Sequence, residues 1–134
     1  MAIPSGSGSE VLRNASINAN ASGSAKVDFG GATGTGTMRS TGNSSGVINV
    51  PTNVIITVLN ITCTSNSNTH DISIFVDWQG AGTDIAIAYQ KDLLVDHTFV
   101  FNDKIVLREG DELGLYNSAS SCDWSVNFIY QDWT

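Results

Sequence analysis

Apolar and polar residues alternate along most of this chain, and this alternation constrains the fold more than any other feature of the sequence. The clearest case is the final stretch, in which every second residue from Trp124 to Tyr130 is large and apolar. A period of two places such residues on one face of a β-strand. Helix-forming composition is confined to Tyr89–Val95, which is too short to stand alone as a helix. The pattern therefore predicts an all-β fold.

Turn residues separate the strand segments at intervals of roughly 8–12 residues, which is typical of β-sandwiches and jelly rolls. The segments with strand character are residues 11–19, 26–29, 47–50, 54–64, 72–78, 85–89, 98–101, 104–107, 112–117 and 124–130. Residues 54–64 are apolar on both faces for most of their length, as expected of a central strand. We predict an antiparallel, jelly-roll-like β-sandwich of about eight strands.

The chain has the length of a single domain. Residues 1–8, rich in Pro, Ser and Gly, are expected to form a flexible N-terminal arm. Residues 9–134 would form one β-sandwich domain. Within it, residues 20–46 are a Gly/Ser/Thr-rich insertion, which we expect either to project as a hairpin or to be ordered by a neighbouring molecule. Such a segment favours self-assembly, because neighbouring subunits could supply contacts that the chain lacks.

The formal net charge is −7, and only six residues are Lys or Arg. Nucleic-acid phosphates and anionic membranes both attract clustered basic residues, so neither is an expected partner. Residues 1–9 have neither the basic start nor the apolar run of a signal peptide. We therefore expect synthesis in the cytoplasm without export, and we predict that Cys63 and Cys122 are reduced thiols rather than a disulfide.

Residues that could support catalysis or metal binding do not occur in recognisable patterns. His70 and His97 lack nearby His, Cys or carboxylate residues at ligand spacing, and a surface or half-buried structural role is expected for both. The carboxylates fall mostly at strand ends and turns, where turn chemistry explains them. The Gly-rich stretch 30–36 lacks the features of a phosphate-binding loop. We expect no enzymatic activity, no metal and no cofactor.

The three tryptophans could in principle form a sugar-stacking platform. Trp78 and Trp124 fall on the apolar register of their strands, so we expect both to lie in the core. Trp133 lies beyond the last strand and is a candidate for an exposed anchor at an interface.

Three stretches resemble small virion proteins of tailed bacteriophages, especially cyanophage-like ones. They are Met1–Leu12 (MAIPSGSGSEVL), Val50–Pro51 with the central strand Ile55–Thr62 (IITVLNIT), and parts of the ending, namely Phe99–Leu107, Glu109–Leu113 and Tyr130–Thr134. Together they cover about half of the chain, and residues 20–46 depart from the pattern by being longer and richer in Gly.

The resemblance implies a β-sandwich carried on the virion, as a capsid decoration (cement) protein or as a tail or neck component. The expected partners are the major capsid protein or other virion proteins, and the subunit is expected to self-associate, with a trimer implied by the resemblance alone. Met1, Ile3, Pro4 and Trp133 are the candidate partner contacts, because the arm would gain order only on another surface. The alternative is a carbohydrate- or receptor-binding module on the virion tail or neck.

Overall fold

The computed structural model describes residues 8–19, 22–30, 36–37, 39–40 and 47–134. The elements in these ranges are β1 (Ser9–Ala19), β2 (Gly23–Lys26), β3 (Gly36–Thr37), β4 (Arg39–Ser40), β5 (Val54–Ser65), β6 (His70–Asp77), the short helix η1 (Trp78–Gly80), β7 (Asp84–Leu93), β8 (Thr98–Phe101), β9 (Ile105–Leu107), β10 (Glu112–Asn117) and β11 (Cys122–Asp132). The described part of the chain holds eleven strands, which is more than the expected eight or so. Two of them, β3 and β4, have only two residues each.

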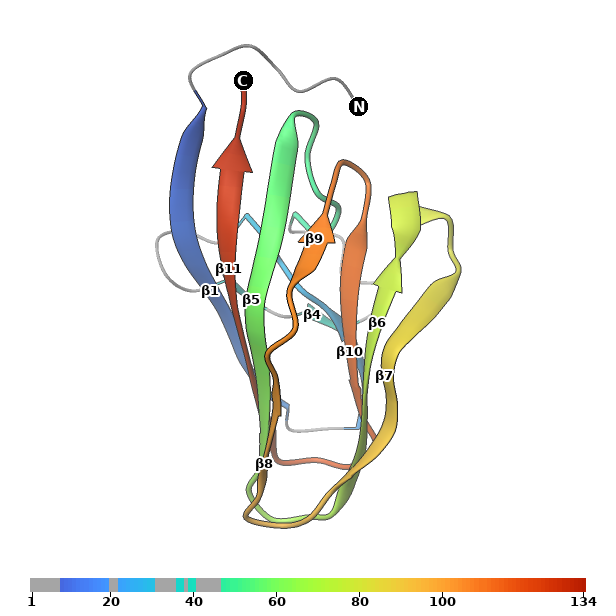
Figure 1. Ribbon diagram of the computed structural model, residues 1–134. Coiled ribbons are helices and arrows are strands. Elements are labelled where there is room, and N and C mark those ends of the chain that lie inside the picture. Colours follow the sequence, from blue (N-terminus) through green and yellow to red (C-terminus); the bar gives the residue numbers. More distant parts are fainter. Residues whose placement is uncertain (1–7, 20–21, 31–35, 38, 41–46) are drawn as a thin grey trace.

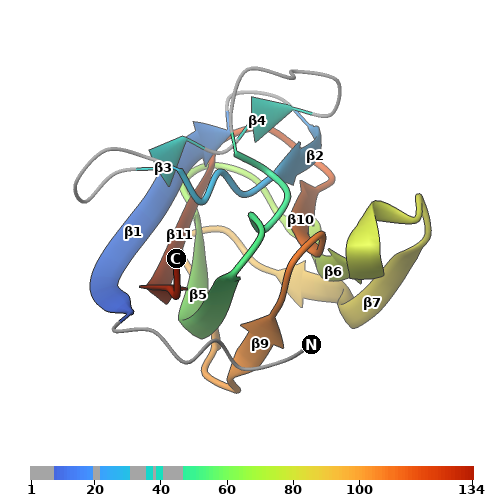
Figure 2. The same cartoon turned by 90° about the horizontal axis from the view of Figure 1, so that it is seen from above.

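The strands form two sheets packed face to face (Figures 1 and 2). The larger sheet has the order β3-β1-β11-β5-β8, with β9 also pairing with β5, and the smaller has the order β4-β2-β10-β6-β7. All neighbours pair antiparallel except β1 and β3. Successive strands cross repeatedly from one sheet to the other, which confirms the predicted jelly-roll-like sandwich.

The core lies between the inward faces of the two sheets. Along β5 every second residue is buried on each side of a bulge that lies opposite Asn127 and Phe128, and along β11 every second residue from Cys122 to Phe128 is buried. Phe29, on the segment that follows β2, meets Phe128 edge to face with ring centroids 5.5 Å apart. Both rings are essentially inaccessible to solvent, so the core predicted from alternation is confirmed.

Two of the expected strands differ from the structure. Residues 47–50 form no strand, although Val50 N donates to Asp111 O over 3.0 Å and Phe29 N donates to Val47 O over 2.8 Å. Strand β2 occupies Gly23–Lys26 rather than 26–29. In both places a buried segment takes its hydrogen bonds from turns and loops, so apolar residues occur without a regular ladder.

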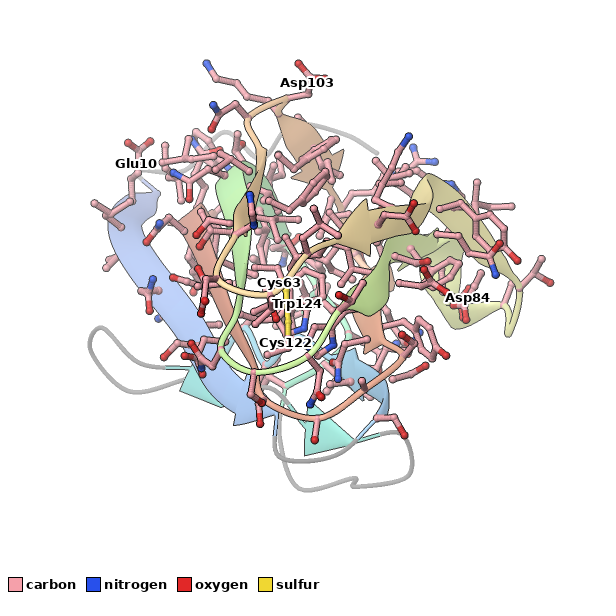
Figure 3. The ribbon with its side chains drawn as sticks, turned by 90° about the horizontal axis from the view of Figure 1, so that it is seen from below. Glu10, Cys63, Asp84, Asp103, Cys122 and Trp124 are labelled. Carbon is pink, nitrogen blue, oxygen red and sulfur yellow. A yellow bond between two sulfur atoms is a disulfide. The ribbon has the colours of Figure 1, made fainter. Side chains whose placement is uncertain are left out.

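The prediction of reduced thiols is wrong, because Cys63 and Cys122 form a disulfide (Figure 3). Their strands, β5 and β11, are antiparallel neighbours in which Cys63 lies opposite Trp124 and Cys122 lies opposite Ser65. The two cysteines are thus diagonal neighbours on the inward face, with Cα atoms 6.5 Å apart, within the span that a disulfide bridges. A separation of 59 residues in sequence concealed this proximity.

Two further burial expectations are wrong. Trp78 is 41% exposed, because β6 ends at Asp77 and the chain turns into η1 one residue before the alternation would place the indole in the core. His70 is only 1% exposed, and neither of its ring nitrogens has a hydrogen-bond partner among the described residues. Trp124 is buried as expected, and its Nε1 donates to Asn117 Oδ1 over 3.2 Å.

Candidate functional site

The candidate partner contacts divide between described and undescribed residues. Met1, Ile3 and Pro4 lie outside the described residues. Trp133 is half-buried beside Gly8, where a Cβ atom added to Gly8 would come within 2.8 Å of Trp133 Cε3. The backbone N–H of Trp133 donates to Asn53 O over 3.0 Å. Trp133 therefore covers the end of the sandwich at which β1 begins, and its role as a partner contact stays a prediction.

The outer face of the larger sheet is a second candidate surface, and its register arranges it in rows. Leu12 of β1 lies opposite Ile129 of β11, which lies opposite Thr57 of β5, which in turn lies opposite Val106 of β9. Leu12 is 68% exposed and Val106 is 59% exposed. This row places aliphatic or β-branched side chains across four strands on the solvent side of the sheet.

An amide row lies below the aliphatic one. Asn14 Nδ2 donates to Asn127 Oδ1 over 2.7 Å and to Ser125 Oγ over 3.1 Å, and Asn127 Nδ2 donates to Asn60 Oδ1 over 2.8 Å. These side chains come from β1, β11 and β5. Because they bond to one another, much of their hydrogen-bonding capacity is used within the face itself.

We call these rows, together with the hydroxyl row beneath them, the uncharged face. Its residues are Leu12, Asn14, Ser16, Thr57, Asn60, Thr62, Val100, Val106, Ser125, Asn127 and Ile129. Charged residues lie around it, with Glu10 and Asp123 along β1 and β11 and Lys104 and Arg108 on either side of β9. A chain of net charge −7 thus carries a sheet face whose centre has no ionisable group.

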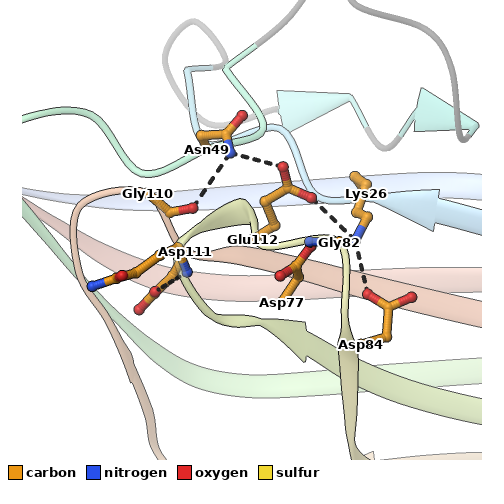
Figure 4. A network of polar contacts seen from close by, with 9 residues as sticks. Lys26, Asn49, Asp77, Gly82, Asp84, Gly110, Asp111 and Glu112 are labelled. Atoms are coloured by element: carbon orange, nitrogen blue, oxygen red, sulfur yellow. Dashed lines mark hydrogen bonds and ion pairs between the residues drawn. The ribbon is translucent and has the colours of Figure 1, made fainter.

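The smaller sheet carries a cluster of charged and polar groups at its outer face (Figure 4). Lys26 Nζ lies 3.2 Å from Asp84 Oδ1 and 3.1 Å from Glu112 Oε2. Asn49 Nδ2 donates to the other oxygen of Glu112 over 2.7 Å. Burial alone would lower the pKa of Lys26, but the hydrogen bonds to Glu112 and Asp84 outweigh it, so the pKa lies above its usual 10.5.

A pKa raised by folding means that the stabilising effect of protonated Lys26 is fully present below the pKa of the unfolded chain. It is lost as the pH rises through the folded value, above about 10.5. We expect Lys26→Met to lower the unfolding free energy by no more than about 1 kcal/mol at pH 8, because partly exposed ion pairs contribute little. The difference between wild type and variant should shrink as the pH rises from 8 through the folded pKa of Lys26, since both chains then lack the ammonium group. Thermal unfolding of the pair across this range measures it, and a difference that grows with pH would contradict the assignment.

Buried carboxylates in the described residues serve turns, in agreement with the expectation from sequence. Asp111 Oδ1 accepts from Gln79 N over 2.8 Å and its Oδ2 accepts from Arg108 N over 2.9 Å. Asp77 Oδ2 accepts from Gly82 N over 2.9 Å. Within the described ranges no three His, Cys, Asp or Glu side chains gather where they could hold a metal ion. In the same ranges no helix has the length and apolar character needed to cross a membrane.

Sequence reasoning missed the uncharged face, although one signal for it was present. Val11 and Leu12 are adjacent apolar residues in an otherwise alternating strand, and so are Phe128 and Ile129. An apolar residue on the polar register of a strand indicates an apolar outer face. What the sequence cannot give is the register that brings Leu12 opposite Ile129.

Comparison with known proteins gives no family and no curated relative, since no family model and no curated protein sequence matches the chain. Among solved structures, the chain is similar to the infectious bursal disease virus Gx strain structure, at 13% identity and TM-score 0.42, over 92% of this chain and 33% of that one. It is similar to the CBM22-1–GH10 modules of Clostridium thermocellum xylanase Xyn10B complexed with xylohexaose, at 12% identity and TM-score 0.41, over 89% of this chain and 26% of that one. It is also similar to the globular domain of zebrafish complement 1qA protein, at 13% identity and TM-score 0.40, over 90% of this chain and 94% of that one. The chain thus spans about a third and a quarter of the first two.

Proposed function

We propose that the chain is a non-catalytic structural protein of a virus particle, most simply a capsid decoration (cement) protein of a tailed bacteriophage. In this proposal the uncharged face binds the outer surface of the capsid. The observation that carries it is the absence of charge from the centre of that face, with charged residues around it. Protein interfaces differ from other surface chiefly in that their cores are depleted of charged residues and their rims are polar.

The hydrogen bonds within the uncharged face support the same role. Covering a polar side chain costs free energy when its water contacts are lost without replacement. Asn14, Asn60 and Asn127 already bond to one another, so a partner that excludes water from this face leaves fewer polar groups unsatisfied. The exposed Leu12 and Val106 would then supply apolar area for the contact.

The size of the uncharged face suggests that a second element contributes to binding. Four strands and three rows cover roughly 20 by 20 Å, or about 400 Å². A standard interface buries about 800 Å² on each partner. Residues 1–7 are joined to β1, the strand that carries Leu12, and we propose that Met1, Ile3 and Pro4 supply much of the remainder.

The disulfide fits a protein that acts outside the cell. Disulfides persist on virion surfaces and in other oxidising environments, whereas cytosolic thiols are kept reduced. A decoration protein made in the cytoplasm and carried on released particles would form the Cys63–Cys122 bond after release. The resemblance of both ends and the central strand to phage virion proteins supports the same location.

The proposed function is tested by placing a charge on the uncharged face. We expect Leu12→Lys to reduce occupancy on capsids stripped of this chain by at least tenfold, because docking would bury an unpaired ammonium group. Leu12 is largely exposed, so the fold should tolerate the change. Co-sedimentation of capsids with increasing amounts of protein measures occupancy.

The matched control is Leu94→Lys, which places the same charge on an exposed leucine just after β7, away from the uncharged face. It should bind as wild type does. Deleting residues 1–7 should weaken binding while leaving the thermal unfolding temperature nearly unchanged. Equal occupancy for wild type and Leu12→Lys would refute docking through this face.

A second candidate function, a carbohydrate- or receptor-binding module on the tail or neck, is favoured by a separate observation. A hollow lined by Tyr89 and Tyr116 lies over the outer face of the smaller sheet.

A further inference from the structure

The hollow over the smaller sheet has a volume of about 310 Å³. Its lining comes from four neighbouring strands, β2, β10, β6 and β7. The residues are Ser24, Ser73, Phe75, Asp84, Tyr89, Gln90 and Tyr116. Ser24, Tyr116 and Ser73 lie in one row across β2, β10 and β6, because Tyr116 is opposite both serines. The floor of the hollow is thus fixed by three hydrogen-bonded strands of the sandwich.

A bulge in β7 shapes the side of the hollow. Ile72 lies opposite Lys91 and Ile74 lies opposite Ala88, so Tyr89 and Gln90 together face the single residue Ser73. Gln90 has a φ of 45°, in the left-handed region, and its N–H donates to Ser73 Oγ over 2.9 Å. Bulges of this kind re-aim side chains, and non-glycine residues with positive φ concentrate at functional sites.

The bulge leaves an aromatic ring presented to solvent. Tyr89 is 60% exposed, and its ring meets Phe75 edge to face with centroids 6.4 Å apart, which holds its orientation. Across the hollow, Tyr116 comes from β10. Two tyrosines, from β7 and β10, therefore line the same hollow.

The charge around the hollow selects against anions. Asp84 of the lining and the nearby Glu112 both engage Lys26, so these three groups together carry more negative than positive charge. The carboxylate of Asp84 is 53% exposed and can accept hydrogen bonds from hydroxyl groups. A phosphate, sulfate or carboxylate ligand would meet repulsion here.

We propose that this hollow binds a neutral saccharide. Tyrosine rings pack against the C–H face of a pyranose, while Asp84, Gln90, Ser24 and the tyrosine hydroxyls match its hydroxyl groups. A volume of about 310 Å³ is at the lower end for small-molecule sites, so one or two sugar units fit. The dissociation constant for a single sugar should be on the order of 1 mM.

The hollow lies over the smaller sheet and the uncharged face lies on the larger one. The two sheets pack against each other (Figure 2), so the hollow and the uncharged face lie on opposite outer faces of the sandwich. If the uncharged face docks on a capsid, as proposed above, the hollow points away from it. The bound subunit would then present a saccharide site to the surroundings of the particle. Sugar binding by the free chain does not depend on docking, so each proposal can fail without the other.

The test is a titration of the ¹⁵N-labelled full chain followed by amide chemical shifts. The probes are methyl glycosides of glucose, galactose, mannose and N-acetylglucosamine, together with neutral disaccharides and tetrasaccharides, each up to about 50 mM. We expect saturable shifts at Ser73, Tyr89, Gln90 and Tyr116 with at least one of these sugars. Affinity should stop increasing at the disaccharide, because the hollow holds no more than two units.

Tyr89→Ala should weaken sugar binding at least tenfold, whereas Tyr89→Phe, which keeps the aromatic ring, should weaken it by a smaller factor. Val106→Ala, on the uncharged face, is the matched control and should bind as wild type does. A glucuronic acid or sulfated sugar should bind more weakly than its neutral counterpart. The proposal is overturned if no neutral sugar gives saturable shifts around the hollow, if Tyr89→Ala binds as wild type, or if the anionic sugar binds more tightly.

Discussion

Replacing both Cys63 and Cys122 by Ser should lower the free energy of unfolding by about 4 kcal/mol. The disulfide joins β5 to β11 across 59 residues of sequence, so it removes much conformational freedom from the unfolded chain. For a domain of this size the unfolding temperature should fall by roughly 10 °C or more. Calorimetry of the double variant and of wild type under oxidising conditions measures this difference.

Reduction provides the control for this prediction. A reducing agent should lower the unfolding temperature of wild type to near that of the double Ser variant and leave the variant unchanged. Alkylation of the oxidised, denatured protein should label neither cysteine, and prior reduction should expose both. Equal unfolding temperatures for wild type and variant, with two thiols labelled before reduction, would show that the bond does not form.

Replacing Asp111 by Ala should cost roughly 3 kcal/mol or more. Asp111 is fully buried, and its two carboxylate oxygens accept from Gln79 N and Arg108 N. It thereby joins η1 to the turn between β9 and β10. Without the carboxylate, two backbone donors would lose their partners, at about 1–3 kcal/mol each when they stay buried.

Asp111→Asn distinguishes hydrogen bonding from packing. Its amide keeps the shape and one acceptor oxygen, so we expect a loss of stability between those of wild type and Asp111→Ala. Asp103→Ala, at an exposed turn position before β9, is the matched control and should change stability by about 0.5 kcal/mol or less. Urea unfolding of the three variants measures the order. Equal stability for Asp111→Ala and Asp103→Ala would contradict the role of the buried carboxylate.

The sandwich could be predicted because its strands obey the alternation that sheets require. In Val54–Ser65 and Cys122–Asp132 the inward positions fall on every second residue, apart from one bulge in the pairing of these two strands. The Glu109–Asp111 turn could also be read directly, since Gly110 has a φ of 87°. Local patterns of this kind need no knowledge of distant residues.

The features that escaped sequence reasoning depend on distant residues or on where a strand stops. The disulfide and the row from Leu12 to Val106 both arise from cross-strand register, which unites positions far apart in the chain. Trp78 was misplaced because η1 begins one residue earlier than the alternation suggests. The shape of the hollow depends on the β7 bulge, and no sequence motif in that strand predicts the positive φ of Gln90.

The two proposed binding surfaces lie on opposite sheets, so the two sides of this small domain would bind different partners. The uncharged face consists of aliphatic, amide and hydroxyl side chains suited to contact with another protein, whereas the hollow combines tyrosines with Asp84. Their separation means that a single subunit could hold a particle on one side and a neutral saccharide on the other. This arrangement connects the decoration proposal with the carbohydrate-binding alternative.

The central claim is that the uncharged face docks on the capsid, and cryo-electron microscopy of the decorated particle tests it most directly. We predict density for this chain on the outer capsid surface, with β1, β11 and β5 facing the capsid and β6 and β7 facing outward. Leu12, Asn127 and Val106 should then be covered by capsid residues. Decoration through the smaller sheet, with the uncharged face open to solvent, would contradict the account.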